Sequence, residues 1–253
     1  MSVAGATTIV NTFIGVDLGW YGKPSGLASV RLEGSWLRLQ NIARLEPVDE
    51  ILGWIAAEAG DGDAVVAVDA PLVIPNQTGI RPGERELNRE YRRFHAGCHA
   101  ANLGRPFAGN VTSFSRRLQA MGYAHGATME ARQKGRFQIE IHPHAASVSL
   151  FGLTQIVKYK RGLRDAKARE LGRLRRLMLT RLPKESPALT LRLPTVPSTG
   201  NTKPVEDRID AVLCAYIGAY WWYWGTERNC VFGSEEKGYI VVPRHTRGIG
   251  TSL

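Results

Sequence analysis

Two aspartates that each follow an apolar run are the residues best suited to chemistry in this chain. Asp17 closes the run 13–16, and Asp69 closes the run 64–68. Short apolar runs of this kind predict buried strands. Strands that are parallel neighbours place their ends side by side, at the usual site of an α/β protein. A buried carboxylate without a partner is costly, so each aspartate needs a cation or hydrogen-bond donors.

Three further acids are expected near the same place. Glu140 lies close to the end of a third expected strand, 137–141. Asp207 and Asp210 are three residues apart in an expected helix, 206–224, and therefore share one helix face. Taken singly, each acid is weak evidence for a site: an aspartate at a strand end is more often a turn former or a helix cap, and Asp207 also suits a favourable charge at a helix N-terminus.

As a set, the acids predict a metal centre. Clustered carboxylates do not all stay ionised without a cation, and oxygen ligands suit Mg²⁺ or Mn²⁺ rather than zinc. Two such ions are a standard arrangement for the attack of water on a phosphodiester. We therefore expect catalytic roles for Asp17, Asp69, Glu140 and Asp210, and metal-ligand roles for Asp17, Asp69, Asp207 and Asp210.

Basic side chains are the expected contacts for a substrate. The formal net charge is +10, which favours a polyanionic partner, nucleic acid before a membrane surface. Residues 158–181 hold ten Lys and Arg against two acids, and Lys158 and Lys160 precede the helix expected there. They are candidates for facing the site, while the rest of the segment either holds a nucleic-acid backbone or is a solvated helix.

Arg81 and His142 are two more candidates for substrate contact, and each also has a purely structural interpretation. Arg81 begins a series with arginines 85, 89, 92 and 93, which either contact phosphates or form a solvated helix with the interleaved Glu84, Glu86 and Glu90. His142 is two residues from Glu140 and shares its strand face. It is a candidate proton carrier or phosphate contact, or a plain histidine at a strand end.

The order of the expected elements predicts an α/β fold. Three strands form an antiparallel meander, and a helix, a strand, an insertion, a strand with its helix, a long final helix and a last short strand follow. The expected ranges are 13–19, 27–32, 36–42, 47–59, 64–68, 137–141, 145–150, 206–224 and 239–242. A mixed sheet with helices on both faces satisfies this order. We expect one domain over 1–253, with an insertion at about 73–135 and a basic helical and loop insertion at about 158–204.

Four motifs in this chain resemble a known family. They are Gly15-Val16-Asp17-Leu18, Val68-Asp69-Ala70-Pro71-Leu72, Glu140-Ile141-His142-Pro143 and Asp207-Arg208-Ile209-Asp210-Ala211. Together they resemble the domain-of-unknown-function family 429, described as predicted nucleases of the RNase H fold, over residues 12–243. The resemblance implies an RNase H-like sheet, with Asp17, Asp69 and Asp210 as metal ligands and Glu140 or Asp207 completing the site.

Three functions are compatible with these features. The first is a nuclease or phosphodiesterase that depends on Mg²⁺ or Mn²⁺. The second is a non-catalytic nucleic-acid-binding module, which keeps the positive charge without the metal. The third is a phosphotransferase of the actin-like ATPase class, because Asp17-Leu18-Gly19 resembles the first phosphate loop of that class; a second such motif on a strand is missing from the sequence.

Location and assembly follow from cysteines, apolar runs and aromatic residues. Three cysteines without paired spacing suit a reducing compartment. No signal peptide is recognisable at the start, and the longest apolar stretch, 211–224, is shorter than the roughly 20 residues of a membrane span. We expect a cytoplasmic protein without a membrane partner. The aromatic residues of the final helix predict core packing or the face of a homodimer.

Overall fold

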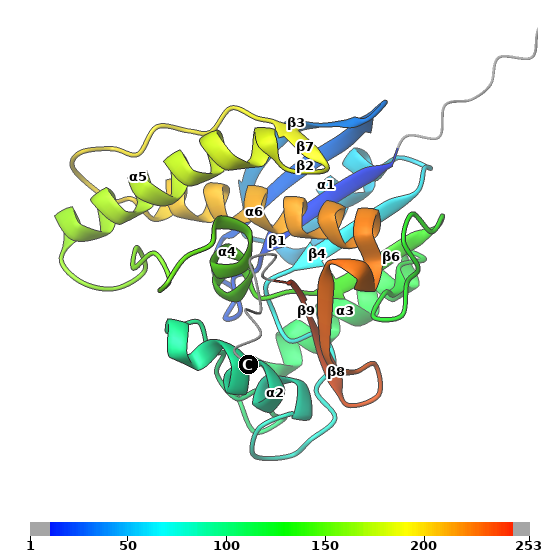
Figure 1. Cartoon of the computed structure of the whole chain (residues 1–253). Helices are drawn as coiled ribbons and strands as arrows, with labels where there is room; N and C mark the ends of the chain where they lie inside the picture. Colours follow the sequence, from blue (N-terminus) through cyan, green and yellow to red (C-terminus); the bar gives the residue numbers. More distant parts are fainter. Residues whose placement is uncertain (1–10, 245–253) are drawn as a thin grey trace, which may run out of the picture.

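The centre of the fold is a seven-stranded mixed sheet in the order β5-β6-β4-β1-β2-β3-β7 (Figure 1), described by a computed structural model over residues 11–244. Its strands are β1 (Thr12–Asp17), β2 (Ser25–Glu33), β3 (Trp36–Leu45), β4 (Ala64–Val68), β5 (Ala124–His125), β6 (Arg136–Glu140) and β7 (Ala188–Thr190). The first three form the expected antiparallel meander, whereas β4 lies parallel to both β1 and β6. The carboxyl ends of β1, β4 and β6 therefore meet at one edge of the sheet.

Helices cover both faces of this sheet, as expected. Helix α6 (Lys203–Trp224) lies on one face, with α4 (Pro143–Phe151) and α5 (Arg164–Arg181) beside it, while α1 (Val48–Ala59) and α3 (Ala108–Ala120) cover the other (Figure 1). Alternate residues of the buried strands serve the two cores, because side chains of a strand point to opposite faces in turn. Phe13 packs in the α6 core and Ile14 in the α1 core. The predicted α/β class with a mixed sheet is confirmed.

Two glycines let α6 approach the sheet at backbone distance. A Cβ atom at Gly15 would collide with the backbone of Ala211 and Ala215, and one at Gly26 with the carbonyl of Asp207. Glycine is the residue that permits such close packing. This contact fixes the first half of α6 over the ends of β1 and β2, and it brings Asp207 and Asp210 to the sheet.

Only the first part of the first insertion, with helix α2, and a C-terminal hairpin lie beyond the carboxyl ends of the central strands (Figure 1). Helix α2 (Pro82–Tyr91) is followed by a 3₁₀ turn (Arg92–Phe94) and packs on the hairpin of β8 (Asn229–Ser234) and β9 (Gly238–Pro243). A single bridge, Ile141 to Val241, joins the hairpin to the end of β6. The sequence predicted β9 but missed β8, β5 and β7, which are short or lie at sheet edges.

Most aromatic side chains of α6 pack in the hydrophobic core of the protein. Tyr216 and Trp221 are fully buried, and Tyr220 is 2% exposed. The expectation of core packing is confirmed for them, and a homodimer through this helix stays a prediction that now concerns only the half-buried Tyr223 and Trp224. None of the helices within residues 11–244 has the length and apolar character that a bilayer crossing requires.

Candidate active site at the ends of the central strands

Asp17 and Asp69 lie side by side, as their places at strand ends predicted. Val16 is paired with Val68 in the parallel β1–β4 ladder, and the Asp69 amide donates a hydrogen bond of 2.9 Å to the Val16 carbonyl. Both aspartates are partly exposed. Within residues 11–244, no side chain or backbone amide makes a hydrogen bond or an ion pair with their carboxylate oxygens. Both carboxylates therefore remain open to a ligand.

The protonation of these two carboxylates is strongly perturbed. Burial raises the pKa of Asp69 to about 6, with a further rise from Asp210 and an opposing effect of Lys160 and Lys203. Burial also raises the pKa of Asp17 well above its ordinary value, against the effect of Lys160, and the neighbouring Asp210 and Asp69 add to the rise. Each carboxylate thus lacks the cation or donors that would stabilise its charge, and a bound cation would supply them.

Asp210 faces the same place but is already engaged. It is fully buried on α6, and the Tyr159 hydroxyl donates a hydrogen bond of 2.8 Å to its Oδ1 atom. The Lys160 Nζ atom lies 2.9 Å from its Oδ2 atom. Lys160 therefore faces the acids, and the pKa of this lysine is raised well above its ordinary value because Asp210, Tyr159 and the two open aspartates outweigh its burial.

Asp207, by contrast, is part of a structural ion-pair network. Arg44 of β3 donates a hydrogen bond of 2.9 Å to its Oδ2 atom, and Lys203 lies 2.8 Å from its Oδ1 atom. Lys203 also binds Glu206 at 2.8 Å. Because Arg44 and Lys203 form ion pairs with both oxygens of the Asp207 carboxylate, we leave Asp207 out of the candidate metal-ligand set.

Glu140 and Arg81 form a second buried network. Arg81 donates from Nη1 to Glu140 Oε2 at 2.9 Å and from Nη2 to Glu140 Oε1 at 2.5 Å, and the Leu72 amide donates to the same Oε2 atom at 2.9 Å. The Nε atom of Arg81 binds Glu84 at 2.8 Å. The Arg81 side chain is 2% exposed.

This network corrects two expectations from the sequence. All three donor positions of the Arg81 guanidinium are occupied, so it is not available to a substrate phosphate, although it contributes to a cavity wall. Both oxygens of Glu140 are occupied as well, so we do not assign it a catalytic role. The physical reason is the burial of Glu140, since a buried carboxylate requires a full set of partners.

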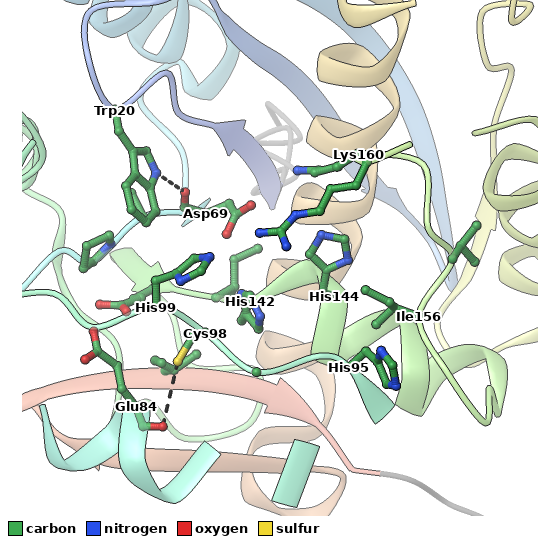
Figure 2. Close-up of a pocket in the computed structure, with 18 of the residues that line it drawn as sticks. Trp20, Asp69, Glu84, His95, Cys98, His99, His142, His144, Ile156 and Lys160 are labelled. Atoms are coloured by element: carbon green, nitrogen blue, oxygen red, sulfur yellow. Dashed lines mark hydrogen bonds between the residues drawn. The ribbon is translucent and has the colours of Figure 1, made fainter. Parts of the chain in front are cut away.

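A cavity of about 660 Å³ lies beside Asp69 (Figure 2). Asp69 and Trp20 both form part of its wall, and the Trp20 indole N–H donates a hydrogen bond of 3.0 Å to the Asp69 carbonyl. Lys158, Lys160 and Arg161 supply positive charge to the lining. A cavity of this size with convergent polar groups is typical of a small-molecule or substrate site.

Histidines form a further part of the cavity wall. His95, His99, His142 and His144 all line it. Burial and the charge of Lys160 lower the pKa of His142 to about 4, and the same causes lower that of His144 well below its ordinary value. Both rings are therefore neutral at pH 7. The buried Nε2 atom of His142 has no hydrogen-bond partner among residues 11–244.

The donor atoms at this place suit Mg²⁺ or Mn²⁺, since they are carboxylate oxygens. Asp17 and Asp69 offer open oxygens, and burial raises the pKa of each carboxyl group, an effect that a bound cation would oppose. Asp210 is turned to Lys160 instead, and across residues 11–244 no group of three or more His, Cys, Asp or Glu side chains is arranged to hold a metal ion. The residues present thus fit a cation that is bound by the two carboxylates of Asp17 and Asp69. The third carboxylate, that of Asp210, is neutralised by Lys160.

Several residues of this site were not expected from the sequence. Tyr159 and Arg44 act on acids that are 51 and 163 residues away, and no local pattern indicates such contacts. Lys203 is different, because its spacing of four residues from Asp207 on a helix is a recognisable sign of an ion pair.

Comparison with known proteins identifies a family for this chain. No curated protein matches this chain. The model of a family described as "Protein of unknown function (DUF429)" matches residues 15–237, a range that begins just before Asp17 and includes Asp69 and Asp210. The match extends over most of the chain, so the protein belongs to the DUF429 family, as the four motifs in its sequence indicated.

Proposed function

We propose that this protein is a divalent-metal-dependent nuclease or phosphodiesterase. The observation that carries the proposal is the pair of neighbouring carboxylates, Asp17 and Asp69, which have raised pKa values and no ion-pair partner of their own among residues 11–244. Perturbed acids beside a cavity are typical of catalytic centres. Lys158, Lys160 and Arg161 line that cavity and favour an anionic substrate.

Asp17 and Asp69 would hold Mg²⁺ or Mn²⁺. When bound, such an ion supplies activation of the attacking water and neutralisation of charge on the leaving oxygen. Lys160 attracts the substrate phosphate and Asp210 holds its ammonium group in place, at 2.9 Å. The neutral His142 forms part of the wall of the same cavity.

The pH dependence follows from the same acids. Both aspartates act in their ionised form, and the pKa of Asp69 is about 6 in the metal-free protein. The rate of hydrolysis therefore increases as pH rises through this value, and bound metal moves the increase to lower pH because it favours the ionised carboxylate.

Cleavage assays test the function. We would incubate the protein with single- and double-stranded DNA, with RNA and with bis(p-nitrophenyl) phosphate, in Mn²⁺ or in EDTA. Mn²⁺-dependent cleavage is expected, and Asp17→Asn and Asp69→Asn each reduce it about 100-fold or more. Asp61→Asn, at an exposed aspartate in the turn before β4, is the matched control and leaves the rate unchanged. Cleavage that survives in Asp69→Asn rejects the assignment.

A non-catalytic nucleic-acid-binding module is the second candidate. Its support is the neutralisation of Asp210 by Lys160 and the lack, over residues 11–244, of a preformed group of three metal ligands. Salt-dependent binding of DNA without any binding of Mn²⁺ would favour it. The actin-like phosphotransferase stays a prediction, which ATP calorimetry tests. We also propose a cytoplasmic location, in keeping with three free cysteines.

A further inference from the structure

A second basic hollow lies on α2 and the 3₁₀ turn that follows it. Four arginines line this hollow together with Ile80 and Asn88; they are Arg85, Arg89, Arg92 and Arg93. All four are exposed. Their spacing of four, three and one residues places them on one side of the helix. We call this set the arginine hollow.

The charges of the arginine hollow are not compensated within the described part of the chain. Across residues 11–244, none of the four guanidinium groups makes an ion pair or a hydrogen bond with a carboxylate. Of the three acids on the same helix, Glu84 is buried against Arg81 and Glu86 accepts a hydrogen bond of 2.8 Å from the Gly233 amide. The third, Glu90, is exposed and makes no ion pair with any of the four arginines. Four like charges in one hollow attract an anion, and the arginine fork matches phosphate geometry.

The arginine hollow shares a wall with the cavity beside Asp69. Asn88 lines the hollow, and its side-chain amide accepts a hydrogen bond of 2.9 Å from the Cys98 amide and donates one of 3.2 Å to the Cys98 carbonyl. Cys98 lines the cavity, and so does His95, which directly follows the 3₁₀ turn (Figure 2). The hollow and the cavity are therefore adjacent, on the two sides of the contact between Asn88 and Cys98.

We propose that the arginine hollow binds the phosphodiester backbone of a single-stranded nucleic acid, one nucleotide of which enters the cavity beside Asp69. A cavity of about 660 Å³ has the size of a small-molecule site, so it admits a nucleotide but not a duplex. Unpaired arginines track a backbone without reading its sequence. The substrate class rests on the proposed function, because it joins the hollow to the phosphodiester chemistry of Asp17 and Asp69.

Binding of a labelled oligo(dT) strand, followed by fluorescence anisotropy in EDTA at rising KCl, tests this inference. The test variant is Arg85→Gln/Arg89→Gln/Arg92→Gln. The matched control is Arg116→Gln/Lys134→Gln/Arg192→Gln, which removes the same charge from three exposed residues outside α2 and outside the basic segment 158–181. The unfolding temperatures of both variants are compared with that of the wild type, so that a loss of binding is not a loss of folding.

We expect the test variant to bind the strand about tenfold or more weakly at moderate salt, with a log–log salt slope smaller by about 2, because each phosphate contact on a single strand contributes about 0.7. The control changes affinity less than about threefold, as expected for a long-range charge effect. Equal losses in both variants overturn the proposal. So does absence of strand binding, or an effect confined to vesicles of anionic lipid.

A small substrate separates this inference from the proposed function. Bis(p-nitrophenyl) phosphate fits the cavity without reaching the arginine hollow, so the test variant hydrolyses it at the wild-type rate while Asp69→Asn does not. If the wild type hydrolyses nothing, the proposed function fails and the anisotropy result still decides on the hollow. If oligonucleotide affinity is unaffected while hydrolysis is intact, the hollow fails and the function stands.

Discussion

Asp17 and Asp69 derive their chemical character from backbone pairing. The β1–β4 ladder sets two carboxylates next to each other in a partly buried place, without giving either an ion-pair partner of its own within residues 11–244. The cost of ionisation appears in the raised pKa of each group. A site that is costly to the free protein is poised to bind a cation.

Asp69→Asn should stabilise the metal-free protein at neutral pH. The pKa of Asp69 is about 6 in the folded chain against an ordinary 3.8, so the folded state binds the proton more tightly. Stability therefore falls as pH rises between these two values and stays lower above them. Thermal unfolding in EDTA should show a midpoint a few degrees higher for the variant at about pH 7.5 and nearly equal midpoints at about pH 4.

In the same assay, addition of Mn²⁺ should make the unfolding midpoint of the wild type higher than that of Asp69→Asn. A cation that binds only the folded state raises the unfolding midpoint of the wild type, whereas Asp69→Asn responds weakly because a ligand is missing. Asp61→Asn, exposed and remote from the strand ends, should behave as the wild type. Equal midpoints of wild type and Asp69→Asn at neutral pH would mean that the carboxylate is already neutralised.

Lys160 sets the protonation of its neighbours. It lowers the pKa of both Asp17 and Asp69. Lys160→Gln should therefore shift the rising limb of the pH–rate profile to higher pH, and Lys160→Arg should largely restore it. A role in phosphate attraction alone would instead raise KM and leave the profile in place, so steady-state kinetics at several pH values distinguish the two roles.

At the scale of elements, a buried ion-pair network joins α2 to the end of β6. Arg81 holds Glu140 and Glu84 together, and its side chain is 2% exposed. Arg81→Gln should cost about 3–5 kcal/mol of unfolding free energy, because two buried carboxylates lose their cation. Arg38→Gln breaks the exposed pair with Glu33, at 2.7 Å, and should cost less than about 1 kcal/mol. Urea unfolding measures both; similar losses would contradict the structural role of Arg81.

The close packing of α6 on β1 depends on Gly15. Gly15→Ala places a methyl group against the backbone of Ala211 and Ala215, so the helix is pushed from the sheet at a cost of about 1–3 kcal/mol or more. Because Asp210 precedes Ala211, hydrolytic activity should fall as well. Gly53→Ala is the control: it lies on the exposed side of α1 with open space around it and should stabilise by up to about 1 kcal/mol. Equal unfolding curves for the two variants would refute this packing.

At the scale of the molecule, sheet and insertions have separate roles. The central strands and α6 supply the acids Asp17, Asp69 and Asp210. The segment between α4 and α5 supplies Tyr159 and Lys160, and the insertion after β4 supplies the arginine hollow. The positive net charge of +10 thus includes Lys160 and Lys203, which lie close to the acids.

Much of the fold could be predicted from the sequence, because its elements follow local rules. The apolar run 64–68 is β4 residue for residue, and helical spacing located α1 and α6 within a few residues. The strands β5 and β7 were missed because two or three residues at a sheet edge carry too little pattern. Strand β8 was missed because Asn, Cys, Gly and Ser interrupt its apolar alternation.

The sequence by itself determined which acids would gather, since strand ends in a parallel sheet and one face of a helix are consequences of period and order. Only the tertiary structure decided which acids stay open. Arg81 meets Glu140, Arg44 meets Asp207 and Lys160 meets Asp210 across large separations in the chain. Ion pairs of this kind depend on where folded segments come to lie, and no local pattern encodes them; Asp17 and Asp69 are the two acids that such contacts leave free within residues 11–244.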